Sequence, residues 1–343
     1  MTVLNAFRGR IALRVLPRSL VVCVATVAAI LVVAAITLTT GDFPLPLGEV
    51  IRTLFGGGSA LDEFVVNTLR LPRLLTGLLV GAALAVGGAT FQSVSRNPLG
   101  SPDIIGFTQG AATGALIVIV VLHGSNPQIA LGALITGLGT AIVVYLLAMK
   151  RGVHGYRLIL VGVGVAAMLT ATNGYLITRA NLADAQAAAV WLTGSLNGRD
   201  WSQVYPIAIA LLVLLPIAMY LGRGLRLLEL GDDTARALGV AAERVRVGAV
   251  LVGVALAAIA TASAGPIVFV ALAAPQVTRR LTRVPGPNIV PTALTGAFLL
   301  SASDLVAQRI FDPVELPVGV FTGVLGGIYL AWLLSREWRK GRG

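Results

Sequence analysis

Residues 96–107, RNPLGSPDIIGF, join two long apolar runs and contain two prolines and two glycines. This composition is typical of a surface turn, and equally of a broken helix that lines a path through a membrane. Pro98 has no backbone N–H donor and disfavours a helical conformation at Asn97. The rest of the sequence has to decide which of the two structures this segment forms.

The chain of 343 residues is too apolar for a water-soluble globule. Hydrophobic residues make up 56% of it and charged residues only 12%, whereas a soluble domain carries about 25% charged residues. The apolar residues gather in runs of about 20, the length that spans the hydrocarbon core of a bilayer. A membrane β-barrel would show short alternating segments instead. The sequence therefore predicts an all-α polytopic membrane protein.

We expect about ten transmembrane helices, at 19–39, 74–94, 104–122, 128–149, 158–178, 202–221, 247–264, 267–281, 289–308 and 316–335. The spans near 104–122 and 267–281 are short or begin at Gly/Pro breaks. The first run follows a basic segment, as a signal peptide does, but it is long enough to span and has no clear cleavage site before Asp42. We therefore expect a retained helix, with an N-terminal segment 1–18, a membrane domain 19–335 and a basic tail 336–343.

The basic residues predict the orientation of the chain. Ten spans place both termini on one side of the membrane, and the segments on that side hold 20 of the 26 Lys and Arg residues. Because basic loops stay in the cytoplasm, both termini are predicted to be cytoplasmic. The net charge of +11 is then a feature of membrane topology and does not indicate nucleic-acid binding. Six arginines remain outside: Arg52, Arg70, Arg73, Arg179, Arg199 and Arg309.

The longest cytoplasmic loop, about residues 222–246, contains the stretch LGDDTARALGV. Asp232 or Asp233 is predicted to cap a short helix that Gly239 ends. A second short helix is expected to begin near Ala241, with Glu243 in its first turn. The loop would then place two short helices on the cytoplasmic face of the membrane; the alternative is a merely solvated connection.

The sequence contains no motif for energy-yielding or catalytic chemistry. Neither Lys150 nor Lys340 stands in a P-loop pattern, and no HExxH, GxSxG or acidic metal cluster occurs. A single cysteine makes neither an internal disulfide nor a thiolate metal site. Asp304 is the exceptional acid within a span, and we favour a structural acid with a partner at Ser301, Ser303 or a neighbouring helix over an ion-coupling group. The chain is therefore interpreted as a conduit that is driven by a separate protein.

Four stretches occur in order over residues 70–335: LRLPRLLTGLLVGAALAVGGATFQSVSRNPLGSPDIIGF, LGDDTARALGV, SAGPIVFVALAAPQVTRRL and DPVELPVGVFTGVLGGIYLAWLL. Together they resemble the permease subunits of ABC importers for ferric siderophores and vitamin B12. The variants NPLGSPDIIGF and VALAAPQ are most similar to the ferric-enterobactin type. The resemblance implies a ten-helix subunit of the bacterial cytoplasmic (inner) membrane. Helices two to five and seven to ten would form two halves of opposite orientation.

The resemblance also implies partners. The subunit would pair with a second permease, a related chain or alternatively a second copy, and the substrate path would run along their interface. Two ATPase subunits would bind from the cytoplasm and a siderophore-binding protein from outside. ATP would be used by the ATPase subunits, and this chain would bind no cofactor.

The resemblance assigns the cytoplasmic gate to four residues: Asn97, Leu99, Gly155 and Tyr156. Residues 96–107 would then line a path, where non-helical backbone is tolerated at membrane depth. Family members usually have small hydroxyl residues at the position of Tyr156, so that residue departs from the family pattern. In the fifth span, Thr170 and Asn173 lie on one helix face. They either line the path or form hydrogen bonds between helices.

Docking and coupling residues follow from the same resemblance. Arg70 and Arg73 match the family's Arg-Leu-Pro-Arg, which attracts acidic residues of the binding protein. A third family arginine aligns with Gln308, and we assign its role to the adjacent Arg309. The alternative for these arginines is snorkelling at the membrane surface. The segment that matches the family's ATPase-coupling helix contains Gly231, Asp232, Asp233, Ala235, Leu238 and Gly239.

The sequence thus predicts one half of the channel of an ATP-driven importer for a ferric siderophore, similar to enterobactin. Cobalamin and haem are the alternative substrates within the family. An ion-coupled secondary carrier is the alternative class, and an intramembrane protease is disfavoured because no catalytic constellation is present.

Overall fold

The computed structural model describes residues 2–6, 11–15, 17–102, 106–148, 155–311 and 315–340 of the chain. From Pro17 onward the described residues form helices and their connections. Before them, β1 (Thr2–Ala6) and β2 (Ile11–Val15) pair antiparallel, with Thr2 opposite Val15. The predicted all-α membrane domain is confirmed.

Each of the ten predicted spans corresponds to a helix. These helices are α1 (Pro17–Thr39), α4 (Leu71–Ser95), α5 (Phe107–Leu116) with the π-helical η3 (Ile117–Val121), α6 (Asn126–Ala148), α7 (Gly155–Arg179), α9 (Trp201–Leu228), α11 (Ala242–Ala264), α12 (Val270–Thr282), α13 (Ile289–Arg309) and α14 (Val318–Lys340). By length and composition, seven helical stretches in the described part of the chain are able to cross a membrane, and two shorter apolar helices accompany them.

The two short spans expected at Gly/Pro breaks are confirmed. One is α5 with η3, Phe107–Val121, and the other is α12, with 13 residues. Each begins directly after a residue in a left-handed backbone conformation, Gly106 with a φ of 78° and Phe269 with a φ of 72°. A bulky residue such as Phe269 rarely adopts this conformation, so the surrounding packing must hold it there.

Several helical elements lie between the spans: α2 (Leu47–Leu54), α3 (Ala60–Glu63), the π-helical η1 (Phe64–Arg70), α8 (Leu182–Thr193) and α10 (Asp232–Ala237). Only α10 was expected from the sequence. A helix does begin next to Ala241 with Glu243 in its first turn, as predicted, but it is the start of α11 and not a separate short helix. No proline interrupts residues 242–264, so α11 runs unbroken through the span.

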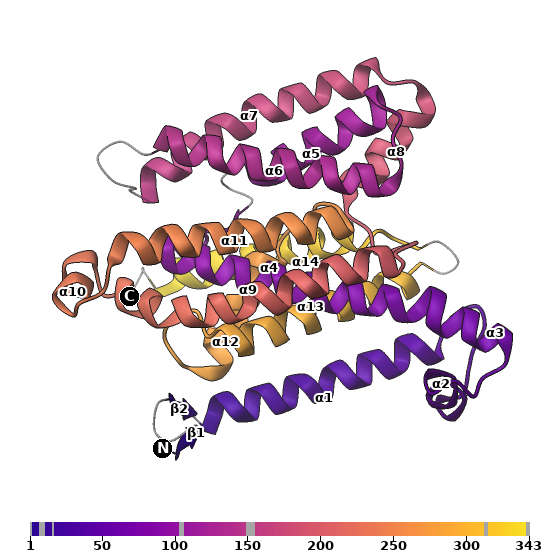
Figure 1. Ribbon diagram of the computed structural model, residues 1–343, viewed down its shortest axis with the longest axis horizontal. Coiled ribbons are helices and arrows are strands. Elements are labelled where there is room, and N and C mark those ends of the chain that lie inside the picture. Colours follow the sequence, from indigo (N-terminus) through magenta and orange to yellow (C-terminus); the bar gives the residue numbers. More distant parts are fainter. Residues whose placement is uncertain are drawn as a thin grey trace.

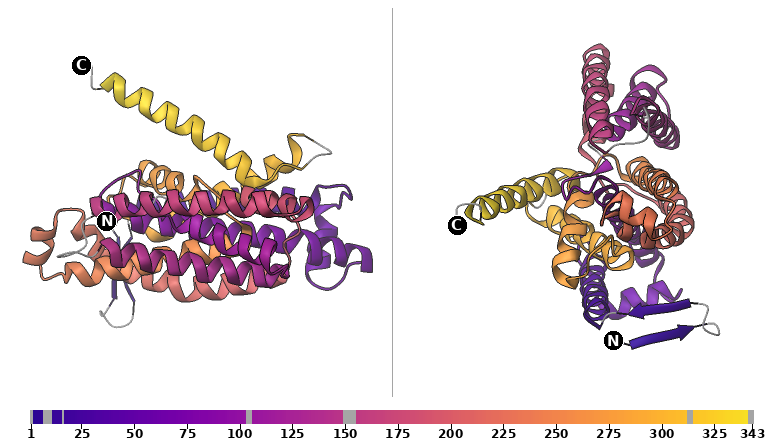
Figure 2. Two further views of the ribbon diagram at one scale, coloured as in Figure 1. Left: turned by 90° about the horizontal axis from the view of Figure 1, so that it is seen from above. Right: turned by 90° about the vertical axis from the view of Figure 1, so that its left-hand side faces the viewer.

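Helix α4 lies in the middle of the bundle. In Figure 1, α9, α11 and α13 surround it, α5, α6, α7 and α8 stack together on one side, and α1 lies on the opposite side. Both views of Figure 2 show α14 leaning away from the other helices. Helix α10, the start of α1 and the end of α14 lie at one end of the bundle, and α2 and α3 lie at the other. We call these the α10 end and the α2 end.

Glycines on α4 allow its backbone to pack directly against the backbones of α12 and α13. A Cβ at Gly81 would overlap the carbonyl of Gly296 on α13, and one at Gly88 would overlap the carbonyl of Ala271 on α12. In lipid no hydrophobic effect drives helices together, so backbone contact of this kind stabilises their association. The close packing fixes α12 and α13 against α4, and with them the side chains at both ends of the bundle.

Candidate functional site

Helix α4 ends in a tight turn at Asn97, the first residue assigned to the gate. Arg96 has a left-handed φ of 51° and terminates the helix. The Oδ1 of Asn97 accepts a hydrogen bond from the backbone N–H of Leu99 at 2.9 Å, and its carbonyl accepts one from the N–H of Gly100 at 2.9 Å. An asparagine side chain that bonds the backbone two residues later stabilises a turn in this way. The sequence NPLG thus forms a defined bend.

Gln276 of α12 holds this bend in place. Its Nε2 donates hydrogen bonds to the carbonyl of Pro98 at 3.0 Å and to Oε1 of Gln92 at 2.8 Å. The Nε2 of Gln92 in turn donates to the carbonyl of Leu272 at 3.1 Å. The stretches NPLG and VALAAPQ, which carry much of the family resemblance, therefore meet in one place. Leu99 remains 41% exposed beside them.

A polar cluster joins four helices at the same point. The hydroxyl of Ser93 on α4 donates to Glu229 at the end of α9, at 2.7 Å, and Arg279 of α12 donates to the same carboxylate at 3.2 Å. Arg96 forms an ion pair with Asp232 of α10. These polar contacts thus link the end of α4 to α9, α10 and α12.

Asp232 is shared by two arginines. Arg246 of α11 lies 2.6 Å from one of its carboxylate oxygens and 3.0 Å from Glu243, while Arg96 contacts the other oxygen. Partial burial acts to raise the pKa of Asp232, but the hydrogen bond and charge of Arg246, with the charges of Arg96 and Arg236, outweigh it and hold the pKa below its ordinary value. The Arg246 side chain is 10% exposed and that of Arg96 is 43% exposed, so Arg246 is the more firmly fixed partner.

The expectation that Asp232 or Asp233 caps α10 is wrong. The N-cap residue is Gly231, with a φ of 113°, and no side chain caps the helix. Asp232 is instead engaged by the two arginines, and Asp233 lies 3.6 Å from Arg236 on its own helix.

The remaining residues assigned to coupling divide between the core and the surface. Ala235 is fully buried and Leu238 is 60% exposed. Gly239 follows the helix as predicted, with a φ of 80°, and a Cβ at this position would meet open space. The α10 segment therefore rests on α9 and α11 through Ala235 and presents Leu238 outward.

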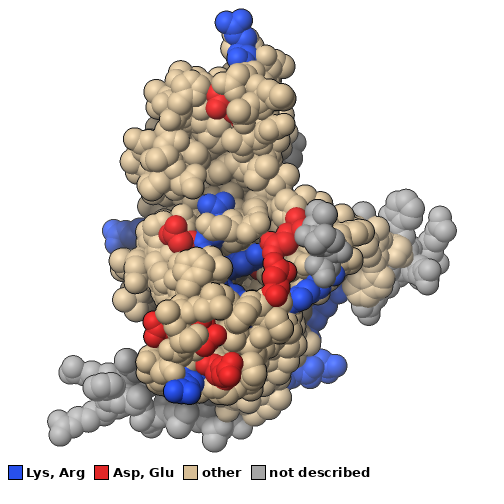
Figure 3. Space-filling view, turned by 90° about the vertical axis from the view of Figure 1, so that its right-hand side faces the viewer, with Lys and Arg blue, Asp and Glu red and all other residues tan. Residues whose placement is uncertain are grey.

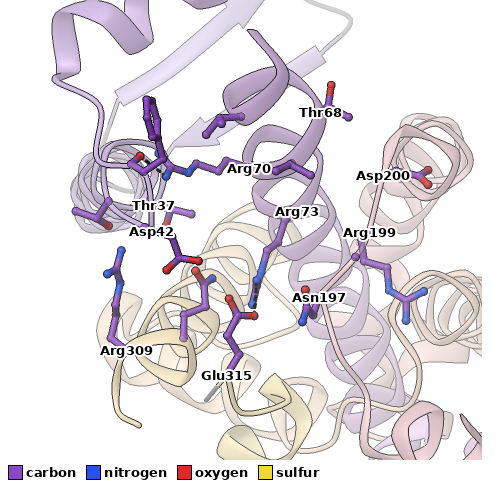
Figure 4. A pocket seen from close by; sticks show the side chains of 17 residues that line it. Thr37, Asp42, Thr68, Arg70, Arg73, Asn197, Arg199, Asp200, Arg309 and Glu315 are labelled. Atoms are coloured by element: carbon purple, nitrogen blue, oxygen red, sulfur yellow. Dashed lines mark hydrogen bonds and ion pairs between the residues drawn. The ribbon is translucent and has the colours of Figure 1, made fainter. Parts of the chain in front are cut away.

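A pocket of about 450 Å³ opens at the α2 end (Figure 4). All three predicted docking arginines line it, together with one further arginine and three acids: Arg70, Arg73, Arg309, Arg199, Asp42, Asp200 and Glu315. Figure 3 shows acidic and basic side chains gathered around the middle of this face. The structure thus brings the predicted docking residues together, but among carboxylates that the sequence analysis left unassigned.

Arg73 is held inside the protein. Its Nε and Nη2 donate to the two carboxylate oxygens of Asp304 on α13 at 3.0 and 3.1 Å, and its Nη1 donates to Glu315 at 2.9 Å. Gln308 donates a further hydrogen bond to Asp304 at 2.7 Å. The Arg73 side chain is 13% exposed and that of Asp304 is 6% exposed. Asp304 therefore has a partner on a neighbouring helix, and Arg73 lines the pocket with its guanidinium already paired to two carboxylates.

Arg70 and Arg309 differ from Arg73 in their surroundings. Arg70 donates to the carbonyl of Leu38 at 2.8 Å and to that of Phe43 at 2.6 Å, so it satisfies backbone acceptors at the end of α1 and just beyond it. Arg309 lies at the end of α13 and is exposed beside the pocket. Of the three predicted docking arginines, Arg309 is the one most available to a partner.

Arg199 and Asp200 enter the pocket from the segment before α9. The Nε of Arg199 donates to the carbonyl of Ser195 at 3.1 Å, and burial lowers the pKa of Arg199 below its ordinary value. Asp200 is the N-cap of α9, and hydrogen bonds from Ser202 lower the pKa of its carboxyl. Among the outside arginines, Arg199 was given no role by the sequence analysis.

Thr170 and Asn173 have different environments on α7. Asn173 is buried and bonds to α5: it accepts from the Thr113 hydroxyl at 2.7 Å and lies 3.3 Å from both the carbonyl and the side-chain oxygen of Gln109. Asn173 therefore fits the interpretation of hydrogen bonding between helices. Thr170 is exposed, and its hydroxyl donates to the carbonyl of Ala166.

The other two residues assigned to the gate, Gly155 and Tyr156, begin α7, but their side chains lie outside the described residues. No group of three or more metal-ligating side chains occurs among the described His, Cys, Asp and Glu residues.

The sequence alone does not mark Arg96, Glu229 or Arg246 as site residues. The available signal was position, since Arg96 directly precedes the gate turn and the other two flank the predicted α10. Without the fold, nothing in the sequence showed that these three residues meet.

Comparison with known proteins gives a consistent result. The FecCD transport family matches residues 28–336. The ferric enterobactin transport system permease protein FepG of Escherichia coli (strain K12) is 47% identical over 323 residues, covering 94% of this chain and 98% of the relative. The iron(3+)-hydroxamate import system permease protein FhuG of Bacillus subtilis (strain 168) is 37% identical and covers 93% of this chain and 98% of its own. A solved inward-facing structure of a metal-chelate type ABC transporter superimposes with a TM-score of 0.82 at 28% identity, covering 92% of this chain and 99% of that one.

Proposed function

Because this chain belongs to the FecCD transport family, we propose that it is a permease subunit of an ATP-driven importer that carries a ferric siderophore across the bacterial inner membrane. The family resemblance and the multi-pass membrane architecture expected from the sequence are confirmed. The observation that carries the substrate assignment is the 47% identity to a ferric enterobactin permease over 94% of the chain.

The proposed substrate is an enterobactin-like ferric chelate. Several relatives between 36% and 40% identical are named for hydroxamate, citrate or other siderophore systems. These names favour an iron chelate over the alternatives of cobalamin and haem. They also make a carrier that is driven by an ion gradient the weaker proposal.

The relatives are transport permease subunits, so this chain is assigned conduction and not catalysis. ATP would be bound and hydrolysed by two separate ATPase subunits at the α10 end, which the distribution of basic residues predicts to be cytoplasmic. A siderophore-binding protein would dock at the α2 end. A second permease, a related chain or a second copy, would complete the path.

Within this scheme the bend at Asn97 closes the path toward the cytoplasm. Its defined hydrogen bonds and the exposed Leu99 beside it support this role. The α10 segment, with Leu238 facing outward, is the proposed contact with an ATPase subunit. Arg309 and the other arginines around the pocket at the α2 end are the proposed contacts with the binding protein.

The test is uptake in a strain from which this gene is deleted. Radioiron bound to ferric enterobactin, to a hydroxamate and to citrate is offered separately, with labelled cobalamin as the control for the family. Loss of ferric enterobactin uptake with cobalamin uptake intact, restored by the gene on a plasmid, is the expected result. Uptake that survives ATPase loss and collapses with an uncoupler would support the ion-coupled carrier instead.

A further inference from the structure

One ion pair connects the proposed ATPase contact directly to the proposed gate. Arg96 is the last residue before Asn97, and its guanidinium contacts Asp232, the first residue of α10. A charged side chain in this chain is uncommon, since only 12% of residues are charged. Neither the gate turn nor α10 needs this ion pair for its own structure, so we ask what the pair does between them.

The geometry points to Arg96 as a positioning residue that transmits movement of α10 to the gate turn, with Asp232 as its partner. This inference rests on the proposed function, because it needs α10 to be the ATPase contact and Asn97 to be part of the gate. It adds the connection between them, which the family resemblance did not assign to any residue of this chain.

The two arginines on Asp232 make the pair suitable for this task. Arg246 is 10% exposed, contacts Asp232 at 2.6 Å and is also paired with Glu243, so it fixes the carboxylate to α11. Arg96 is 43% exposed and pairs with the other oxygen of the same carboxylate. The Arg96 contact can therefore break or re-form while Asp232 keeps a charge partner, which is the kind of two-state contact that coupling between sites requires.

Movement of Arg96 would reach the gate turn through the backbone that follows it. Arg96 is left-handed, with a φ of 51°, and the next residue is Asn97, whose side chain and carbonyl shape the bend. The bend also rests on Gln276 of α12. A shift of the Arg96 backbone would therefore move Asn97 relative to α12, because the hydrogen bond from Gln276 ties the carbonyl of Pro98 to that helix.

Ser93 and Glu229 form a second link, one turn earlier on α4. Their contact of 2.7 Å joins α4 to the end of α9, which leads directly into α10. This link is anchored to α12 through Arg279. The end of α4 therefore contacts this segment at two points, through Ser93 at the end of α9 and through Arg96 at the start of α10.

The experiment uses the complete importer, with its partner permease, ATPase and binding protein, in proteoliposomes. Ferric-siderophore uptake and ATP hydrolysis are measured together for Arg96→Gln, Arg96→Lys, Asp232→Asn and the double variant Arg96→Gln/Asp232→Asn. Arg223→Gln is the matched control, because Arg223 is an exposed arginine of α9 near the same end. Co-purification of the ATPase reports assembly of each variant.

Arg96→Gln is expected to lower uptake per ATP hydrolysed at least about fivefold, the lower range of measured couplings between sites. Assembly and ATP hydrolysis should remain near wild type. Arg96→Lys should recover most of the loss, Arg223→Gln should behave as wild type, and the double variant should be no worse than Asp232→Asn alone.

Unchanged uptake per ATP in Arg96→Gln would overturn the inference, as would losses that multiply in the double variant. An Arg96→Gln chain that no longer binds the ATPase would show that the pair builds the complex and does not couple it, which also overturns the inference. A wild-type complex without ATP-dependent uptake would instead contradict the proposed function.

Discussion

A bidentate ion pair joins Arg73 of α4 to Asp304 of α13 near the α2 end of the bundle, although the two residues are 231 positions apart in the sequence. Both side chains are largely buried, and Gln308 and Glu315 complete the hydrogen bonding around them. The Arg-Leu-Pro-Arg stretch thus contains two arginines with different tasks. Arg73 braces two helices, and Arg70 satisfies carbonyls at the end of α1.

Replacing Arg73 with methionine is expected to destabilise the protein by about 3 kcal/mol, because removal of one partner leaves a buried charge uncompensated. Thermal unfolding of the detergent-solubilised chain measures the effect as a lower midpoint. The double variant Arg73→Met/Asp304→Leu should recover most of the loss, since no lone charge remains. Glu315→Gln is the control: its side chain is 41% exposed, and an exposed pair contributes about 1 kcal/mol or less. A stable Arg73→Met variant would show that the pair is not a brace.

Arg309→Glu is expected to weaken docking of the binding protein about fivefold or more at low salt, because opposite charges steer and hold such partners. The difference from wild type should shrink at 0.5 M salt, where exposed charges are screened. Surface-immobilised binding protein and detergent-solubilised importer provide the measurement. Arg223→Glu, at the α10 end, is the control for net charge. Equal affinities of Arg309→Glu and wild type at low salt would exclude Arg309 from the docking surface.

The sequence predicted the spans and the sites with unequal success. Runs of about 20 apolar residues locate a membrane helix whatever surrounds it, so each expected span corresponds to a helix. The partners of single side chains depend on which helices meet. The Arg73–Asp304 pair and the Arg96–Asp232 pair join distant segments, and a carboxylate at the start of α10 looked like a helix cap. Only the packed structure shows that the Asp232 carboxylate pairs with Arg96 and Arg246.

A disulfide at the gate turn is expected to block uptake reversibly. Asn97→Cys is combined with cysteine at the matching position of the second permease, in a Cys23→Ser background that removes the one native thiol. Oxidation should stop transport and a reductant should restore it, because a closed gate held shut cannot conduct. The unpaired Asn97→Cys chain, treated identically, controls for loss of the Asn97 hydrogen bond to Leu99. Full transport by the oxidised, cross-linked pair would remove Asn97 from the gate.

Gly239→Leu is expected to lower uptake per ATP while leaving membrane insertion intact. The glycine has a φ of 80°, and a left-handed conformation costs a non-glycine residue roughly 1–2 kcal/mol. Because a Cβ there meets open space, the strain has to be relieved by a change of backbone just after α10. Gly56→Leu is the matched control, since Gly56 has a φ of 82°, is equally uncrowded and lies between α2 and α3. Equal uptake per ATP hydrolysed in the two variants would show that the backbone geometry after α10 does not matter for transport.

Gly326 and Gly327 of α14 offer a sharp test of how that helix is attached to the bundle. A Cβ at Gly326 would overlap the ring of Phe269, the left-handed residue before α12, whereas a Cβ at Gly327 meets open space. Gly326→Ala is therefore expected to destabilise the chain by about 1–3 kcal/mol, the usual cost of overpacking, by displacing either α14 or the strained backbone at Phe269. Gly327→Ala should be neutral or slightly stabilising, because alanine favours the helix over glycine. The two variants differ by one position and have the same composition, so thermal unfolding isolates the contact with Phe269. Identical midpoints would mean that α14 does not rest on Phe269 in the membrane.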